Sequence, residues 1–184
     1  MVDKNTQPLA VITGGASGIG LSAVKRFLDE DYEVLILDAN KDAGEESVNN
    51  LKSDTYNVNF AYCDITNHAQ IDTVFADLQA NNRPAHVLVN CAGISPALNP
   101  LHQYSVEEWH RTININLHGT FYACREFLKL ATAQKIDAGA IVNVASIMGV
   151  RASAAQAPYA ASKHAVVGLT KSIAQDYALS LIHI

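Results

Sequence analysis

Short runs of apolar residues alternate along the chain with longer segments in which apolar residues recur every three or four positions. Residues 9–13 form a continuous run, Leu-Ala-Val-Ile-Thr, that stops at a cluster of glycines. Between residues 19 and 30 apolar residues occur at 19, 23, 24, 27 and 28, among others, which is the spacing of a helix with one buried face. Thr66 or Asn67 is expected to cap the third helix. The pattern predicts strands over 9–13, 33–37, 57–62, 86–89 and 140–144, and helices over 19–30, 42–52, about 67–80, about 109–133 and 159–178.

The composition of these strands predicts how the sheet is arranged. The strands are rich in valine, isoleucine and leucine, which indicates a sheet covered on both faces. Strands that alternate with helices are typical of a doubly wound, parallel α/β sheet. We therefore expect a single Rossmann-like domain over residues 1–178.

Composition and charge exclude several classes of protein. Hydrophobic residues make up 49% of the 184 residues and charged residues 17%, as in a globular domain large enough to bury a core. A net charge of -5 provides no basic surface for a nucleic-acid backbone. Two uncharged stretches, 5–24 and 84–106, are interrupted by proline, glycine and polar residues, so we expect neither to span a membrane.

Cysteine usage indicates the compartment. Cys63, Cys91 and Cys124 are an odd number without CxxC spacing. Such a set favours small, reduced, buried thiols and a cytoplasmic location. No group of histidine, cysteine and aspartate residues has the spacing of metal ligands, so we expect no metal.

A glycine-rich turn, Thr-Gly-Gly-Ala-Ser-Gly-Ile-Gly over residues 13–20, lies between the first predicted strand and the first predicted helix. Glycines let the backbone approach a ligand closely, and the free N–H groups of the helix suit a pyrophosphate. Tight connections between a strand and a helix also use glycine, so the turn alone is weak evidence for a ligand site. A P-loop needs a lysine before its final serine, and this chain has Leu21 there, which excludes that class of site.

Asp38 strengthens the case for a dinucleotide. It ends the second predicted strand eighteen residues after Gly20, where a carboxylate can accept hydrogen bonds from an adenosine ribose. The alternative role is a cap for the next helix. A carboxylate there repels a 2′-phosphate, Ser17 in the turn is neutral, and the nearest cation is Lys41, so we expect NAD rather than NADP.

Tyr159 and Lys163 are four residues apart in the last predicted helix and therefore share one face of it. An ammonium beside a phenol stabilises the phenolate, so the pair can exchange a proton with an alcohol. Such pairs are also common on exposed surfaces. Ser146 favours the catalytic role, because it follows the fifth predicted strand at the sheet edge where open α/β sheets bind ligands.

These motifs together resemble those of the short-chain dehydrogenase/reductase family, over the chain to about Ala178. The glycine pattern of 13–20 is similar to the family's cofactor turn. The segment 90–93, Asn-Cys-Ala-Gly, resembles its Asn-Asn-Ala-Gly element, with Cys91 departing at the second position. Asp64 matches an acidic position near the adenine ring, or else caps a helix. Asn116 matches the asparagine of the catalytic tetrad, or else is a buried structural residue.

The resemblance implies a set of site residues. The catalytic group would be Asn116, Ser146, Tyr159 and Lys163. The cofactor would be held by Thr13, Gly14, Ser17, Gly18, Ile19, Gly20, Asp38, Asp64, Ile65, Asn90, Ala92, Gly93, Tyr159 and Lys163.

The resemblance also implies the reaction, the reversible oxidation of a secondary alcohol to a ketone with NAD. Ser146 would hold the substrate oxygen, Tyr159 would exchange its proton, and Lys163 would favour the phenolate and bind the nicotinamide ribose. Asn116 would position a water that relays protons through Lys163. The alternatives are an NADPH-dependent 3-oxoacyl-type reductase and a non-catalytic dinucleotide sensor or scaffold.

The C-terminal residues depart from the family pattern. Family members continue past the last helix into a sixth and a seventh strand, whereas residues 179–184 read Leu-Ser-Leu-Ile-His-Ile. We expect the native chain to diverge near Leu179, the segment 179–184 to be a non-native tail and the sheet to be incomplete there. A chain of this length is expected to be inactive, and the full protein to be a homodimer or homotetramer.

Overall fold

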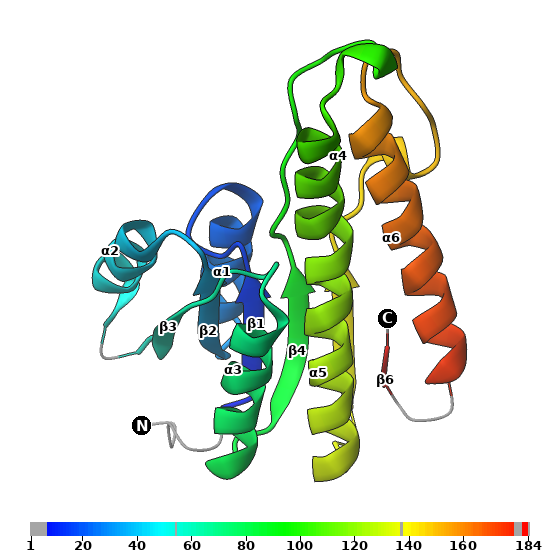
Figure 1. Ribbon diagram of the computed structural model, residues 1–184. Coiled ribbons are helices and arrows are strands. Elements are labelled where there is room, and N and C mark those ends of the chain that lie inside the picture. The colour runs from blue at the N-terminus through cyan, green and yellow to red at the C-terminus, as the bar shows by residue number, and fades with distance from the viewer. Residues whose placement is uncertain (1–6, 54, 137, 179–181, 184) are drawn as a thin grey trace.

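A parallel sheet of six strands, in the order β3-β2-β1-β4-β5-β6, forms the centre of the molecule (Figure 1). The computed structural model describes residues 7–53, 55–136, 138–178 and 182–183. The strands are β1 (Leu9–Thr13), β2 (Glu33–Asp38), β3 (Val58–Tyr62), β4 (Ala85–Asn90), β5 (Gly139–Asn143) and β6 (Ile182–His183). The α-helices are α1 (Gly18–Asp29), α2 (Lys41–Leu51), α3 (His68–Ala80), α4 (Val106–Ile113), α5 (Gly119–Gln134) and α6 (Ala157–Asp176). The predicted parallel α/β fold is confirmed.

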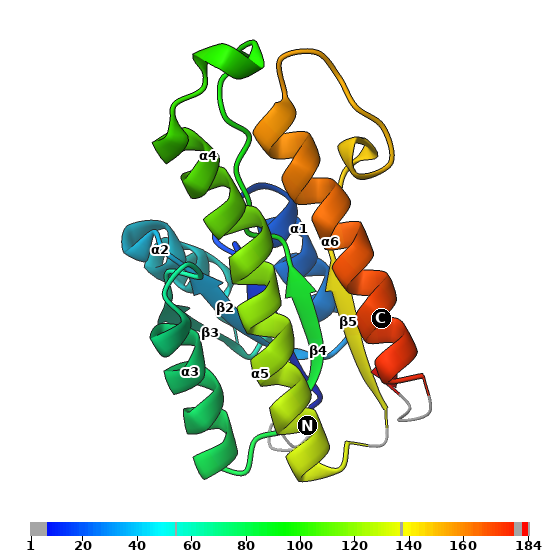
Figure 2. The ribbon, with the colours of Figure 1, turned by 45° about the vertical axis from the view of Figure 1, so that its right-hand side comes forward.

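The side chains of β1 show why its residues read as one apolar run. All five are buried, and alternate residues point to opposite faces of the sheet. Leu9 and Val11 belong to a core layer with residues of α3, α5 and α6, and Ala10 and Ile12 to a second layer with residues of α1. Both faces of the sheet are thus covered, with α3, α5 and α6 on one side in Figure 2.

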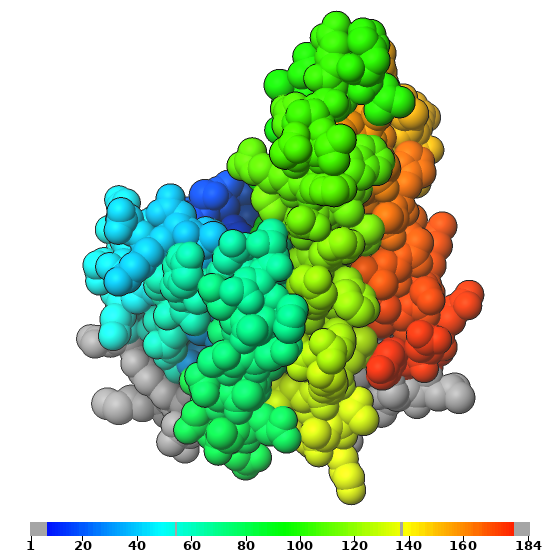
Figure 3. All heavy atoms as spheres, in the orientation of Figure 1, coloured from blue at the N-terminus to red at the C-terminus, as the bar shows by residue number. Residues whose placement is uncertain are grey.

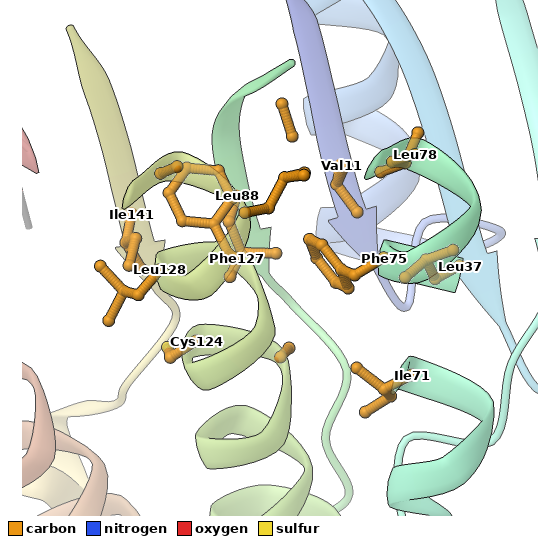
Figure 4. Packing of buried hydrophobic residues seen from close by; sticks show 14 of the residues in the cluster. Val11, Leu37, Ile71, Phe75, Leu78, Leu88, Cys124, Phe127, Leu128 and Ile141 are labelled. Atoms are coloured by element: carbon orange, nitrogen blue, oxygen red, sulfur yellow. The ribbon is translucent and has the colours of Figure 1, made fainter. Parts of the chain in front are cut away.

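The larger core layer holds α3, α5 and α6 against the sheet. Phe75 of α3 and Phe127 of α5 pack beside Val11 and Leu88 of the two central strands (Figure 4). Full burial of such side chains is worth about 1.5–3 kcal/mol each, so this layer fixes where α5 and α6 lie relative to the carboxyl ends of the strands.

The order of the strands reverses at β1, which lies between β2 and β4. Connections from neighbouring strands leave in opposite directions at such a point and open a crevice beyond their carboxyl ends. The glycine turn follows β1, and the segment 91–93 follows β4, so both lie at this crevice.

The helix predicted over 109–133 is confirmed, but it contains a π-helical turn that divides it into α4 and α5. It begins earlier, at Val106, behind a capping box in which Ser105 accepts a hydrogen bond from the N–H of Glu108 and the Glu108 carboxylate accepts one from the N–H of Ser105. Between α4 and α5 the residues Asn114–His118 form a π-helical turn. A π turn inserts an extra residue into the helix without changing the apolar spacing on either side, so the sequence pattern did not distinguish it.

The structure corrects the expectation of five strands. Ile182 pairs with Gly139 and His183 with Ala140, as a two-residue parallel strand beside β5. The other residues of the predicted tail, 179–181 and 184, lie outside the described residues. Among the helices that are described, none has both the length and the apolar character needed to cross a membrane.

Candidate active site

A cleft of about 410 Å³ lies beyond the carboxyl ends of β1 to β4. Ten of the fourteen predicted cofactor residues line it, and they come from four separate segments of the chain. They are Gly14, Ser17, Gly18, Ile19, Gly20, Asp38, Asp64, Ile65, Ala92 and Gly93. The fold therefore brings together the motifs that the sequence placed at successive strand ends.

The glycine turn forms one wall of the cleft, and its geometry requires glycine. The N–H of Gly14 (φ +65°) donates to the Leu37 carbonyl at 2.8 Å, which ties the turn to β2. A Cβ on Gly20 would lie 2.0 Å from the Gly14 carbonyl oxygen. Gly18 (φ +52°) begins α1, and no atom lies within 4 Å of where its Cβ would be. A side chain at that position would fill space beside the N-terminus of α1, so the turn fits a pyrophosphate.

Two carboxylates, Asp38 and Asp64, also line the cleft. Asp38 accepts hydrogen bonds from the N–H of Ala16 at 3.1 Å and the N–H of Asn40 at 2.9 Å. Asp64 accepts from the N–H and the hydroxyl of Thr66, at 2.9 and 2.8 Å.

Neither carboxylate is the N-cap of the following helix, because Asn40 caps α2 and Asn67 caps α3. Asn67 was one of the two caps expected for α3. No lysine or arginine is among the described residues that line the cleft.

Thr13 and Asn90 are buried behind the cleft. The Thr13 hydroxyl accepts from the N–H of Ala92 at 3.3 Å and donates to Asn90 at 3.4 Å. The Asn90 amide donates to Asn143 at 2.8 Å and lies 3.3 Å from the Cys124 sulfur. These bonds join the ends of β1, β4 and β5, so the two residues support the cleft wall from the protein interior.

Asn116 is the centre of a second cluster of polar groups. It lies in the π-helical turn and is only 1% exposed. Its amide oxygen accepts from the N–H of Ile94 at 2.8 Å, and its amide nitrogen donates to the Ile94 carbonyl at 2.9 Å and to Ser162 at 3.0 Å. The Ser162 hydroxyl in turn donates to the Tyr159 carbonyl at 2.7 Å. The π turn thus ties the loop after β4 to the first turns of α6.

Lys163 joins this cluster to the cofactor cleft. Its ammonium donates to the Val144 carbonyl at 2.7 Å and lies 5.8 Å from the centroid of the Tyr159 ring. A Cβ on Gly93 would lie 3.6 Å from the Lys163 nitrogen and 3.2 Å from the Asn116 amide oxygen. Burial lowers the pKa of Lys163, and the neighbouring Cys91 acts weakly in the opposite direction. A compact, buried cation therefore lies at the edge of the cleft.

Ser146 follows β5, as the sequence predicted. Its hydroxyl accepts from the N–H of Met148 at 3.1 Å and starts the short turn Ile147–Gly149. This turn packs directly on α6, because a Cβ on Gly149 would lie 2.9 Å from the Lys163 carbonyl oxygen. Ser146 is thereby held beside the helix that carries Tyr159.

Sequence reasoning missed two kinds of site residue. Ser162, fully buried, transmits the Asn116 contact to Tyr159, and its position three residues after Tyr159 was the available signal. Ile115 lines the cleft but belongs to no motif. Cys91 also lines it, and burial raises the pKa of its thiol.

The other two cysteines are also neutral thiols. Burial raises the pKa of Cys63 to about 11 and that of Cys124 to about 12. All three cysteines are free. A thiol with a raised pKa is a poor nucleophile, so none of the three is prepared for covalent chemistry.

Comparison with known proteins identifies the family of the chain. A family model described as short chain dehydrogenase matches residues 8–184. The chain is 36% identical to 3beta-hydroxysteroid dehydrogenase of Mediterraneibacter gnavus, over 94% of this chain and 61% of that protein. It is 34% identical to 3-oxoacyl-(acyl-carrier-protein) reductase of Chlamydia trachomatis serovar D, over 91% of this chain and 66% of that protein.

Among solved structures, an actinorhodin polyketide ketoreductase with NADPH superposes with a TM-score of 0.91 at 30% identity, over 99% of this chain and 69% of that chain. The chain belongs to the short-chain dehydrogenase family. It spans 61 to 69% of the length of these three relatives.

Proposed function

We propose that the protein is an NAD-dependent oxidoreductase that interconverts a secondary alcohol and a ketone. The observation that carries this proposal is the meeting of the polar cluster and the cleft at Gly93. Lys163 and Asn116 both lie against this residue, which itself lines the cleft. A dinucleotide in the cleft would therefore end beside the residues that handle the proton.

The cleft provides what a dinucleotide needs. The glycine turn at the N-terminus of α1 would hold the pyrophosphate, Asp38 the adenosine ribose, and Asp64 with Ile65 the adenine. When bound, the nicotinamide accepts or supplies the hydride.

Each side chain of the cluster has a separate role in proton transfer and substrate binding. Tyr159 exchanges the proton of the substrate oxygen, which Ser146 holds. Lys163 stabilises the phenolate through its charge, 5.8 Å from the ring centroid. The amide of Asn116 is engaged with Ile94 and Ser162, so its side chain positions the start of α6, and its part in a water relay stays a prediction.

We infer a preference for NAD over NADP. The Asp38 carboxylate lines the cleft and would meet a 2′-phosphate with like charge. Lys41, the nearest cation along the chain, lies 3.7 Å from Glu45 and is paired with it. The charge of this end of the cleft therefore favours a free ribose hydroxyl.

One observation favours the second candidate, an NADPH-dependent 3-oxoacyl-type reductase. Arg111 of α4 lines an adjoining hollow of about 590 Å³ together with Ala39 and Asp64. If the 2′-phosphate of NADPH reached this hollow, the Arg111 guanidinium could bind it.

Paired cofactor assays test the proposal. The protein expressed from its gene is assayed with a panel of secondary alcohols and ketones, with NAD(H) and NADP(H) in parallel. We expect activity with NAD(H) and, for Asp38→Ala, a preference shifted towards NADP(H) by about tenfold or more. Activity confined to NADP(H), and lost in Arg111→Ala, would establish the second candidate. Cofactor binding without turnover of any alcohol or ketone would refute both.

We further propose that the protein forms a homo-oligomer and that it is located in the cytoplasm. An apolar groove of about 660 Å³ runs between α5 and α6, and the exposed Phe121 lies on it. An exposed apolar groove of this kind fits a second copy of the chain, and sedimentation analysis that found only monomers would refute this. Three free cysteines support a reducing compartment.

A further inference from the structure

Two loops from distant parts of the chain are joined by one phenol. The first loop follows β4 and leads into α4, and the second connects Ser146 to α6. Tyr104, at the end of the first loop, lies 51 residues from Ala155 in the second. In Figure 1 the loop before α4 and the loop before α6 lie at the same end of the molecule, and Figure 3 shows the first one projecting there.

The Tyr104 hydroxyl is at the centre of a small hydrogen-bond network. It lies 2.6 Å from the Ala97 carbonyl oxygen and 2.8 Å from the Ala155 carbonyl oxygen, so its single proton lies between two acceptors. The N–H of Asn99 reaches both the Ala155 carbonyl, at 3.2 Å, and the Tyr104 oxygen, at 3.4 Å. Four polar groups from the two loops thus satisfy one another.

The residue that receives these bonds has a strained backbone. Ala155 has a φ of +61°, in the left-handed region that a residue with a Cβ rarely adopts. Such a conformation persists only when its surroundings stabilise it. The two donors on the Ala155 carbonyl, Tyr104 and Asn99, are that stabilisation.

The position of Ala155 links this strain to the active site. It immediately precedes Gln156, which occupies the N-cap position of α6, and comes four residues before Tyr159. Ser146 lies at the other end of the same connecting segment. The direction in which the chain enters α6 therefore depends on the conformation of Ala155.

We propose that Tyr104 is a positioning residue that holds Ala155 in its left-handed conformation and so fixes the Ser146–Tyr159 segment against the loop after β4. This rests on the proposed function, since it assigns a role toward Tyr159 and the substrate. The hydroxyl of Tyr104 is hydrogen-bonded to Ala97, Asn99 and Ala155 of these two loops.

The variant Tyr104→Phe keeps the ring and removes the hydroxyl. We expect kcat/KM to fall about three- to tenfold while the Kd of NADH stays unchanged. Adding Ala155→Gly should restore kcat/KM, because glycine adopts a positive φ without the Cβ penalty. Tyr32→Phe, on the turn before β2, is the matched control and should behave as the wild type.

A second readout does not depend on catalysis. The Asn99 amide should exchange hydrogen faster in Tyr104→Phe than in the wild type, and slow down again in the double variant. Unchanged kinetics and exchange in Tyr104→Phe would overturn the proposal, as would a defect that Ala155→Gly fails to rescue. If the wild type oxidised no alcohol, the proposed function would fail, while the exchange of Asn99 would still decide whether Tyr104 holds the loops.

Discussion

The two halves of the proposed active site are built in different ways. The cofactor half consists mainly of backbone, in a turn of eight consecutive residues, 13–20, whose glycines make room for a ligand. The catalytic half consists of side chains from distant positions, such as Asn116 and Ser162, which are 46 residues apart and 3.0 Å from each other. The first half depends on the absence of side-chain atoms, and the second on buried side-chain hydrogen bonds.

This difference predicts which property a substitution in each half should impair. Adding atoms to the glycine turn should impair binding and local packing. Removing atoms from the catalytic half should impair turnover or leave buried polar groups without partners. Variants in the two halves should therefore separate cofactor affinity from catalysis.

The largest effect is expected from Tyr159→Phe, which removes the proton donor and keeps the ring. Turnover should fall by about a hundred- to ten-thousand-fold, the usual contribution of general acid–base catalysis. The Kd of NADH, measured by fluorescence, should not change, because the cleft is lined by other residues. Tyr122→Phe on α5 is the control, and a similar loss of turnover there would break the assignment.

Asn116→Ala should have the next largest effect, this time on folding. It leaves the N–H and the carbonyl of Ile94 without this partner and removes the donor to the Ser162 hydroxyl, which keeps its hydrogen bond to the Tyr159 carbonyl. We expect a loss of about 2–4 kcal/mol in the free energy of unfolding, measured with urea. Asn114→Ala, exposed in the same π-helical turn, should change stability by less than about 0.5 kcal/mol. Equal stability of the two variants would contradict a structural role for Asn116.

The same contrast explains what could be predicted from the sequence. The glycine turn and Asp38 were assigned from contiguous motifs, because strand ends and turns leave local signals. The π turn at Asn116 and the role of Ser162 were not, because they depend on contacts between segments far apart in the chain. The sequence placed Asn90 at the site, but only the structure shows its side chain bonded to Asn143 behind the cleft.

The third prediction tests the glycine turn. In Gly20→Ala the new Cβ would lie 2.0 Å from the Gly14 carbonyl, so the turn must move. We expect a loss of about 1–3 kcal/mol in stability, as in other overpacked sites, together with weaker NADH binding. Gly168→Ala is the control, because nothing lies within 4 Å of its Cβ in the middle of α6. It should gain up to about 1 kcal/mol from helix propensity. If both variants bound NADH as the wild type does, close backbone packing would not be what the turn requires.

The smallest effect concerns the charge of Lys163, which lies where the two halves meet. Burial lowers the pKa of this lysine in the folded protein below its ordinary value of 10.5. Between the folded and the unfolded pKa the unfolded chain binds more protons, so the stability of the folded state rises with pH in that interval. The penalty for burying the ammonium is complete below the folded pKa and disappears as the pH approaches 10.5. Lys163→Met carries no such penalty at any pH.

The measurement is the difference in Tm between the wild type and Lys163→Met across alkaline pH. The Tm of the wild type should rise relative to that of the variant as the pH increases through the interval between the two pKa values. Lys171→Met, at an exposed position on the same helix, is the matched control variant. A difference for Lys163→Met that stayed constant with pH would mean that the ammonium is fully solvated. Its influence on Tyr159 would then be that of a surface charge, and the separation between a backbone-built cofactor half and a desolvated catalytic half would no longer hold.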